Sequence, residues 1–541
     1  MNRMILLIAG TVIGSLLAGR ILIHYFQLES YQFPGYFRTL RRNLLKSLLP
    51  GLAMTALAFI VVFAAGCVFK TENALIWKYA VSAILLTGGG YLFGKIFSEK
   101  KAKKAFVLTA RIKRFYIVAF IVLTAVCLLC SYIVRSCFTA ADMKQRAAEL
   151  FTVIFPVFLP LWIALAGLAA WPFEKGISEL YFRDAQKILK SRDDLIKIGI
   201  TGSWGKTSVK FILGTILEEK YHTLVTPASF NTPMGVTKVI RMKLEPGHRV
   251  FVAEMGARHV GDIKELCRLV HPEYGILTSV GPQHLDTFKT LERIIKTKYE
   301  LMDALPENGV CFFTDDHQIC RELYLKTQKE KHITGLDSSF DDVWAENITY
   351  SSEGSAFDLC TKDTAVRCTT QLLGELNIRN ILLCASVCFR LGMTEEQIAR
   401  GIGKIKPIEH RLQLIRNPGG MSVIDDAFNS NILGAKQAFQ VLRSFSGKRI
   451  VVTPGMVELG EKEYEMNREF GEAMAECCDT AILVGKKRSE AIKEGLSVKS
   501  FPADSVYVVS SLEEATNVLQ QIVRPGDTVL FENDLPDNYT E

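Results

Sequence analysis

The sequence predicts an α/β protein in which a group of five transmembrane helices precedes two catalytic domains. Three observations predict this class. Five apolar segments, each near the ~20 residues that cross a bilayer as a helix, precede residue 176. A phosphate-loop pattern follows a buried strand near residue 200, and strand-like runs alternate with helical patterns beyond residue 190. At 541 residues the chain has room for about three domains.

The five apolar segments cover 3–23, 48–69, 76–97, 115–134 and 150–171. Most positive charge lies in the loop that holds Arg38, Arg41, Arg42 and Lys46, and in the loop 95–114. Because positive loops stay in the cytoplasm, the N-terminus is expected outside and everything after the fifth span inside. The triplet at 88–90, three glycines within the third span, is compatible with close helix packing or with a break.

The net charge of +7 sits largely in these short loops between apolar segments, so it indicates a membrane surface and not nucleic acid. The thirteen cysteines show no metal-ligand pairing, because the only C-x-x-C lies inside an apolar run. Unpaired cysteines in a domain that uses ATP are typical of a reducing compartment. We therefore expect a multi-pass protein of the cytoplasmic membrane with cytoplasmic catalytic domains.

The phosphate-loop pattern is TGSWGKTS at residues 201–208. Gly202 and Gly205 allow a tight turn between a strand at 195–200 and a helix at 207–217, so that backbone N–H groups face an anion. Lys206 would reach the β- and γ-phosphates of ATP, the Thr207 hydroxyl would ligate Mg²⁺, and Ser208 completes the loop.

Further motifs follow the loop, several of them at the ends of apolar strand-like runs, where functional residues of such folds gather. They are TPASFNTPMG at 226–235, AEMG at 253–256, GPQHLD at 281–286, KYE at 298–300, GELNIRN at 374–380, HRLQ at 410–413, DDAFNSN at 425–431 and GMVELG at 455–460. In this order they resemble the Mur ligase family, ATP-dependent enzymes that form amide bonds in bacterial cell-wall synthesis, and most closely its MurF branch. The resemblance covers about 195–530.

The resemblance implies a reaction in which ATP phosphorylates a carboxylate and an amine then displaces phosphate. Mg²⁺ and cations neutralise charge on the transferring phosphoryl group. Glu254 matches the metal-ligating glutamate of the family, His284 the metal-site histidine, and Lys298 the lysine that the family carbamylates. With Lys206 they form the expected catalytic set, and with Thr207 the expected metal ligands.

The remaining site residues are also implied by the resemblance. Asn377 matches a nucleotide contact and Arg411 an arginine that faces the phosphates, and Asn231 would lie near the acyl substrate. ATP and the incoming amine are expected at a run of acidic and amide residues after a strand at 422–424, namely Asp425, Asp426, Asn429 and Asn431. A plain Asx-rich turn accounts for part of that run only.

The chain departs from the family in three local details and one architectural one. It reads Thr278-Ser279 where the family has threonine-asparagine, and Leu376 where it has histidine. After the strand at 528–531, the MurF branch has Lys-Gly-Ser, whereas this chain continues with Glu532. The acidic replacement argues against D-alanyl-D-alanine as the incoming group. The family's N-terminal domain for the uridine diphosphate of the precursor is missing, and membrane helices stand in its place.

We therefore expect a transmembrane region at 1–172, a linker at 173–194, a central ATP-binding domain at 195–406 and a C-terminal domain at 407–541. The expected partners are the lipid bilayer, a cell-wall or polymer precursor, and an amino acid or dipeptide. Two alternatives stay open. One is a membrane ligase that polymerises an amino acid, as in poly-γ-glutamate synthesis, and the other is a non-catalytic scaffold that keeps the fold.

Overall fold

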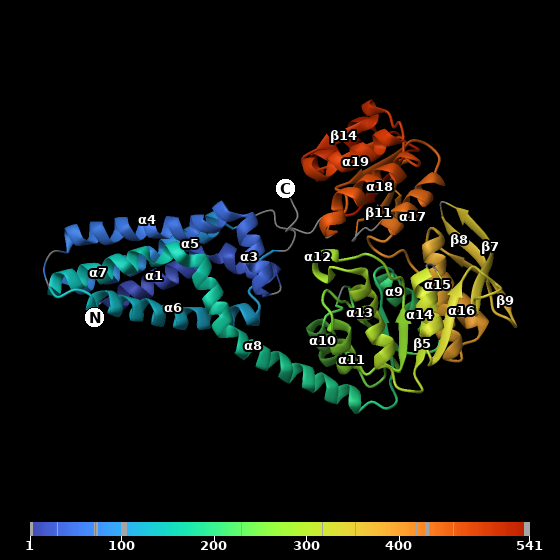
Figure 1. Cartoon of the computed structure of the whole chain (residues 1–541), viewed down its shortest axis with the longest axis horizontal. Helices are drawn as coiled ribbons and strands as arrows, with labels where there is room; N and C mark the ends of the chain where they lie inside the picture. Colours follow the sequence, from blue (N-terminus) through green and yellow to red (C-terminus); the bar gives the residue numbers. More distant parts are fainter. Residues whose placement is uncertain are drawn as a thin grey trace. The chain divides into compact units, whose positions relative to one another are not determined.

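The computed structural model describes residues 4–534, apart from 30, 70, 72–73, 99–104, 229, 316–317, 352, 417–418, 428–431 and 458. It divides into two compact units, Met1–Glu179 and Leu180–Glu541. Within the described ranges the first unit is helical, and the strands all belong to the second (Figure 1).

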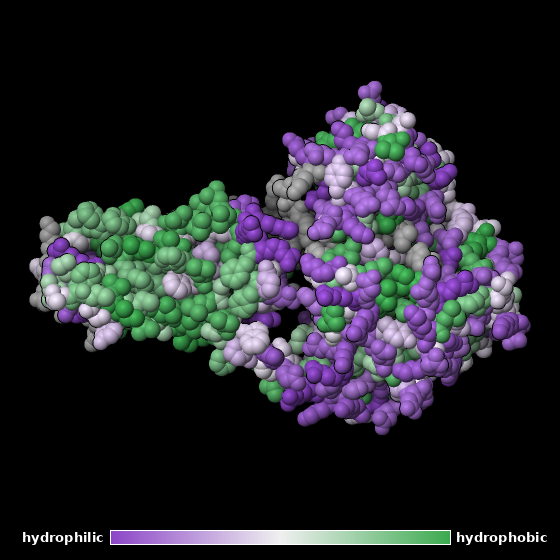
Figure 2. Space-filling view, in the orientation of Figure 1, coloured by the Kyte–Doolittle hydropathy of each residue, from purple (hydrophilic) through white to green (hydrophobic). Residues whose placement is uncertain are grey.

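The first unit is a bundle of apolar helices. Its elements are α1 (Ile5–Ala18), α2 (Arg20–Leu28), α3 (Phe33–Arg42), α4 (Leu44–Val68), α5 (Leu75–Ile96), α6 (Ala110–Ser136), α7 (Ala141–Ile154), the 3₁₀ turn η3 (Phe155–Phe158) and α8 (Leu159–Lys190), the last of which continues past Glu179 into the second unit. The surface along these helices consists largely of hydrophobic residues (Figure 2). Among them are large exposed side chains such as Phe59, Phe63 and Ile121. Such a surface matches lipid better than water.

By length and composition, the described residues contain four helices able to cross a membrane, or up to five if one bent pair counts as a single span. That pair is α1 and α2, which bend by 50° at Gly19. The prediction of a single unbroken segment at 3–23 was therefore too simple. The predicted segment 150–171 likewise lies within a longer stretch, Ala141–Lys190, that is interrupted by η3. Residues 173–190 of the expected linker are helical, because α8 continues to Lys190.

Helix α5 runs without interruption through its three consecutive glycines, and the last of them, Gly90, serves close packing with α1. A Cβ on Gly90 would lie 2.5 Å from the Cα of Gly14 on α1. A Cβ on Gly94 would overlap the backbone carbonyl of Leu17 in the same way. Small residues at four-residue spacing on both helices let the two backbones touch, which is how helices associate where no water drives them together.

The second unit contains a nine-stranded sheet within its described residues, in the order β2-β3-β1-β4-β5-β6-β7-β8-β9. Strands β1 to β7 pair in parallel, and β8 and β9 extend the sheet antiparallel. The strands are β1 (Ile196–Thr201), β2 (Thr223–Val225), β3 (Val250–Glu254), β4 (Tyr274–Leu277), β5 (Val310–Thr314), β6 (Glu330–Gly335), β7 (Val343–Ser351), β8 (Gly354–Cys360) and β9 (Ala365–Thr370). The apolar runs predicted as strands at 195–200, 249–255, 274–279 and 310–313 correspond to β1, β3, β4 and β5.

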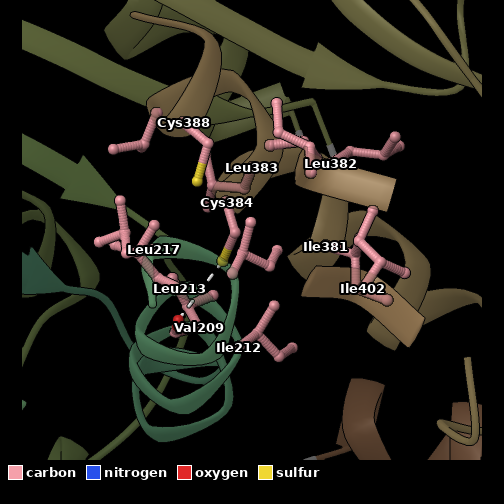
Figure 3. Packing of buried hydrophobic residues seen from close by; sticks show 14 of the residues in the cluster. Val209, Ile212, Leu213, Leu217, Ile381, Leu382, Leu383, Cys384, Cys388 and Ile402 are labelled. Carbon is pink, nitrogen blue, oxygen red and sulfur yellow. Dashed lines mark hydrogen bonds between the residues drawn. The ribbon is translucent and has the colours of Figure 1, made fainter. Parts of the chain in front are cut away.

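Helices cover this sheet. They are α9 (Lys206–Leu217), α10 (Pro233–Lys243), α11 (Asp262–Val270), α12 (Leu285–Phe288), α13 (Leu291–Ala304), α14 (Gln318–Lys326), α15 (Glu375–Arg390) and α16 (Glu395–Gly403). Helix α9 packs against α15 through fully buried aliphatic residues (Figure 3). The Cys384 thiol on α15 donates to the carbonyl oxygen of Val209 on α9, at 3.4 Å. This core fixes the helix that begins at the phosphate loop.

A second, six-stranded sheet has the order β10-β11-β15-β12-β13-β14 in the described part of the chain. Only β10 pairs antiparallel with its neighbour. The elements are β10 (Gln413–Arg416), β11 (Ser422–Asp426), α17 (Ile432–Arg443), β12 (Arg449–Thr453), η4 (Gly460–Lys462), α18 (Glu463–Ala475), β13 (Thr480–Val484), α19 (Lys486–Val498), η5 (Ala503–Ser505), β14 (Val506–Val509), α20 (Leu512–Ile522) and β15 (Thr528–Glu532). It is the parallel sheet with helices that the sequence predicted.

Register brings the functional strand ends together. In the first sheet Ile200 on β1 pairs with Glu254 on β3, and Thr201 pairs with Leu277 on β4. The phosphate loop, Glu254 and Thr278 therefore leave the sheet at one edge. In the second sheet Asp426 on β11 pairs with Glu532 on β15, so both carboxylates lie at the carboxyl edge, where ligands of such sheets bind.

Candidate functional site

The segment 202–205 makes the tight turn that the sequence predicts. Gly205 has φ +83° and lies at the N-terminus of α9, a left-handed conformation that glycine adopts at little cost. A Cβ at Gly202 would overlap the hydroxyl oxygen of Thr278. Ser208 lies in the first turn of α9 and is buried. The N-terminal amides of α9 thus face the strand edge, where they favour an anion.

Lys206 is held against its own loop. Its ammonium donates to the carbonyl oxygens of Gly202 at 2.7 Å and Ser203 at 2.9 Å. Burial lowers the pKa of Lys206 to about 8; the nearby Glu254 opposes this shift and Arg411 adds to it. The lysine therefore lies where a phosphate on the loop would meet it.

Glu254, at the end of β3, is the centre of a buried polar cluster. Its side chain accepts from the Thr207 hydroxyl at 3.1 Å, the Lys210 ammonium at 2.9 Å and the Asn231 amide at 3.0 Å. Burial pushes the pKa of Glu254 upward, but Lys210 and Lys206 outweigh it, so the net shift is downward. The carboxylate is thus ionised and surrounded by donors.

The arrangement fits Mg²⁺. Thr207 and Glu254 supply touching oxygen atoms, which Mg²⁺ prefers, and this ion keeps several waters instead of demanding a complete protein cage. Among the described residues, no three His, Cys, Asp or Glu side chains gather closely enough to hold a metal together. Zinc sites need such a closed cluster of protein ligands, whereas magnesium bound beside phosphates needs only one or two protein oxygens.

Lys298 and His284 lie on separate elements. Lys298 is on α13 and is 2% exposed. Burial lowers its pKa well below the ordinary lysine value; Lys206 adds to the shift, whereas Asp262, Glu254 and Glu300 oppose it. Lys298 therefore interacts electrostatically with the Glu254 cluster. His284 has φ +53° and begins α12, where its carbonyl oxygen accepts from the Thr287 hydroxyl at 3.0 Å.

Helix α15 presents two buried asparagines. The Asn377 amide donates to the Leu373 carbonyl oxygen at 2.9 Å. Asn380, one turn later on the same face, approaches the phosphate loop: its Oδ1 would lie 3.2 Å from a Cβ on Gly205. Its Nδ2 is buried and has no hydrogen-bond partner among the described residues. Asn380 therefore offers a donor directly beside the loop.

The C-terminal sheet contributes Arg411 and an acidic group. Burial lowers the pKa of Arg411, and the charges of Asp426, Glu254 and Glu532 oppose the shift. Arg411 thus acts electrostatically on both sheets' carboxylates. Burial raises the pKa of Asp426 to about 6, while Arg411 and hydrogen bonds from Leu412 N–H and Glu532 oppose the rise. Asp425 instead pairs with the His410 ring at 2.7 Å.

The structure brings together Lys206, Thr207, Glu254 and Asn231, with Lys298 and Arg411 close enough to interact electrostatically. Two predicted substrate residues, Asn429 and Asn431, lie outside the described residues. Sequence reasoning did not single out Lys210, Asn380 or Trp204. The sequence spacing could have identified Lys210, since it lies one helical turn after Lys206 on α9 and therefore on the same face.

Comparisons with known proteins agree with this geometry. Residues 200–388 match the family model of the Mur ligase middle domain, and residues 410–532 match the model described as Mur ligase, glutamate ligase domain. The UDP-N-acetylmuramoyl-tripeptide–D-alanyl-D-alanine ligase of Escherichia coli (strain K12) is 31% identical over 319 residues, 58% of this chain and 70% of that protein. The ligase of the same name from Bacillus subtilis (strain 168) is 27% identical over 336 residues, 62% of this chain and 72% of that protein.

Solved structures share the fold. MurF ligase from Thermotoga maritima, in complex with ADP, superposes with a TM-score of 0.59 at 25% identity and covers 66% of this chain and 80% of that one. A MurF structure from Acinetobacter baumannii gives 0.61 at 24% identity, over 67% of this chain and 78% of that one. The two domain matches, the relatives and the phosphate-loop geometry lead to one conclusion: this chain belongs to the Mur ligase family and is an ATP-dependent ligase that uses ATP and Mg²⁺.

Proposed function

We propose that this ligase is anchored in the cytoplasmic membrane and joins an amine to the carboxylate of a cell-wall precursor or polymer. The observation that carries the proposal is the cluster around Glu254, in which Thr207, Lys210 and Asn231 converge beside the phosphate loop. It combines an oxygen site for Mg²⁺ with cations for a phosphoryl group, on a chain whose first unit is apolar.

The apolar unit supports the membrane part of the proposal. Counting the bent pair α1–α2 as one span gives five among the described residues. An odd number of spans with positive loops on the cytoplasmic side supports our proposal that the N-terminus lies outside and the second unit inside. Relatives named for a UDP-linked precursor are matched over about 70% of their length. The first unit of this chain lies outside the two family-model matches, which cover 200–388 and 410–532. The acyl substrate would accordingly be held at the membrane.

The cluster supports the acyl-phosphate chemistry that the family resemblance implies. The γ-phosphoryl group of ATP passes to the substrate carboxylate, giving an acyl phosphate and ADP. The amine then attacks the acyl carbon, loses a proton, and expels inorganic phosphate to leave the amide. Lys206 and Arg411 would neutralise the phosphoryl charge, and Asn231 would orient the acyl substrate beside Glu254. Mg²⁺ supplies further charge neutralisation, and Thr207 and Glu254 would hold it.

Lys298 and His284 are proposed as the remaining members of the metal site. The resemblance of Lys298 to the family lysine supports the proposal that it is carbamylated, a step in which its amine adds to CO₂, releases a proton and becomes an anion. Mass spectrometry on the native protein, with ¹³C-bicarbonate in the buffer, should find the label on Lys298. Activity that is the same with and without CO₂, in a chain free of the label, would contradict the modification.

The incoming amine would bind at the C-terminal sheet, where Asp425, Asp426, Asn429 and Asn431 are proposed as contacts together with ATP. Glu532 hydrogen-bonds Asp426 at the same edge, and both are acidic. The relatives are named for D-alanyl-D-alanine, whose free carboxylate these side chains would repel. This observation favours a second candidate, a membrane ligase that adds or polymerises a different amino acid.

The decisive experiment incubates membranes that contain the full chain with ATP, Mg²⁺ and candidate amino acids or dipeptides, and measures ADP and product size. Amine-dependent ADP release supports ligation, and product length separates single addition from polymerisation. Lys206→Ala should lose turnover yet insert normally. The control variant Lys436→Ala removes an exposed ammonium paired with Glu469 and should keep the wild-type rate of ATP turnover. No ADP from any acceptor mixture would favour the scaffold.

A further inference from the structure

The phosphate loop is joined to the segment that leads to His284. The Ser203 N–H donates to the carbonyl oxygen of Ser279 at 2.6 Å. The Thr278 hydroxyl donates to the carbonyl oxygen of Trp204 at 2.5 Å. The Ser203 hydroxyl donates to the carbonyl oxygen of Gly281 at 2.9 Å and lies 3.1 Å from its N–H. The two segments therefore form one hydrogen-bonded body.

An aromatic contact completes this body. Trp204 lies inside the loop pattern, yet it is only 8% exposed. Its ring occupies the space where a side chain on Gly281 would be: a Cβ there would lie 2.7 Å from ring carbon Cζ3 and closer still to Cη2. A gap of this kind is tighter than protein packing permits, so residue 281 must be glycine while residue 204 is tryptophan.

The joined segments lie between two parts of the site. Lys206 begins α9 two residues after Trp204, and His284 begins α12 three residues after Gly281. Val280, between the hydrogen-bonded positions, is 1% exposed, so the connecting chain is held within the core. The indole and these hydrogen bonds therefore connect the phosphate loop to the segment that precedes His284.

We propose that Trp204 is a positioning residue that couples nucleotide binding on the phosphate loop to the placement of His284. The inference rests on the proposed role of His284 at the metal and acyl side of the ligase. The indole does not need to touch ATP: it keeps the two segments in register, so that Lys206 and His284 act on the same reacting group.

Hydrogen exchange on the full chain, with and without ADP and Mg²⁺, tests the coupling without requiring a known acceptor. In the wild type, ADP should slow exchange in both 201–208 and 278–288, by about tenfold for amides held by a cooperative segment. At saturating ADP, Trp204→Ala should keep protection at 201–208 but lose much of it at 278–288, because the indole contact at Gly281 is gone and only the hydrogen bonds from Ser203 and Thr278 still join the two segments. Trp204→Phe should show ADP-induced protection at 278–288 that lies between the wild type and Trp204→Ala. If the alanine variant does not fold, the phenylalanine variant tests the coupling in its place.

Two further variants sharpen the test. Gly281→Ala should lower the unfolding midpoint, and Trp204→Ala in the same chain should restore it by making room, while coupling stays lost in both. Trp344→Phe, on β7, is the matched control and should change nothing. Equal ADP protection of 278–288 in the wild type and Trp204→Ala would overturn the coupling alone. Failure of the wild type to bind ADP would overturn the coupling and the ligase function together.

Discussion

The ammonium of Lys210 lies 2.9 Å from the carboxylate of Glu254, and neither side chain is more than 2% exposed. Lys210 also donates to the carbonyl oxygen of Ala228 at 2.5 Å, in the loop that carries Asn231. One lysine therefore joins the phosphate-loop helix, the proposed metal ligand and the proposed acyl-substrate loop. A buried ion pair of this kind depends on both partners, because either one alone is a buried charge.

Lys210→Met should lower the free energy of unfolding by about 3 kcal/mol, since Glu254 is left buried with fewer counter-charges. ATP turnover should be lost because Glu254 shifts. Denaturant unfolding of the purified chain measures the first effect, and ADP release the second. Adding Glu254→Gln should recover much of the stability but none of the turnover. If Lys210→Met is as stable as Lys436→Met, which breaks only an exposed pair, the proposed role of the buried pair is wrong.

Asp426 should make stability depend on pH. Its pKa in the folded protein is about 6, raised above the ordinary value of about 3.9 chiefly by burial. The folded state therefore holds this proton more tightly than the unfolded state. The stabilising contribution is complete below about pH 4 and is lost as pH rises through about 6.

Thermal unfolding of the wild type and Asp426→Asn at pH 4.5 and pH 7 checks this expectation. The variant accepts the same hydrogen bond from Leu412 N–H without the charge, so its advantage over the wild type should grow with pH. Asp363→Asn, on an exposed turn, provides the comparison. An advantage that shrinks between the two pH values would contradict the raised pKa.

The glycine contact in the first unit predicts a position-specific effect. Gly90→Val should separate α1 from α5, because its side chain would overlap the backbone of Gly14. Overpacking of this kind costs about 1–3 kcal/mol, which a melting curve in detergent will show as a lower midpoint. Gly88→Val is two residues away on the same helix and has open space at its Cβ, so it should melt as the wild type does. Equal melting of both variants would refute the packing argument.

Two native thiols report the proposed membrane topology. Cys67, in the last turn of α4, and Cys137, just after α6, are exposed, whereas the other cysteines are buried or partly buried. The proposed five-span arrangement puts the end of α4 and the end of α6, which carry these two cysteines, outside the cytoplasm. A membrane-impermeant maleimide should therefore label intact cells at these two residues, and Cys67→Ser with Cys137→Ser should remove the signal. Labelling that requires permeabilised cells would reverse the topology.

Much of this molecule follows from short sequence patterns. The strand before residue 202, the glycine turn and the helix from Lys206 are local consequences of apolar runs and backbone freedom, and the structure contains all three. The family was identified correctly from its ordered motifs, and the family models and relatives confirm it. The assignment of individual site residues, including Lys298 and His284, stays a prediction.

Other features depend on contacts between distant segments and left no sequence signal. The need for glycine at 281 arises only because the ring of Trp204 lies there, a contact across more than seventy residues. The residues around the bend between α1 and α2 at Gly19 do not differ in sequence from those of an unbroken apolar helix. The triple glycine of α5 allowed two interpretations until its neighbours on α1 were known.

The contact between Lys206 and its own loop has a consequence for selectivity among anions. Any phosphate that recruits this ammonium replaces two charge-assisted hydrogen bonds, those to Gly202 and Ser203. A single inorganic phosphate must offset the loss of both bonds through the contacts of one phosphate group alone. A nucleotide has further groups with which to offset that loss, and the buried Nδ2 of Asn380 beside the loop is a candidate donor to one of them. We therefore expect the loop to bind a nucleotide in preference to free inorganic phosphate.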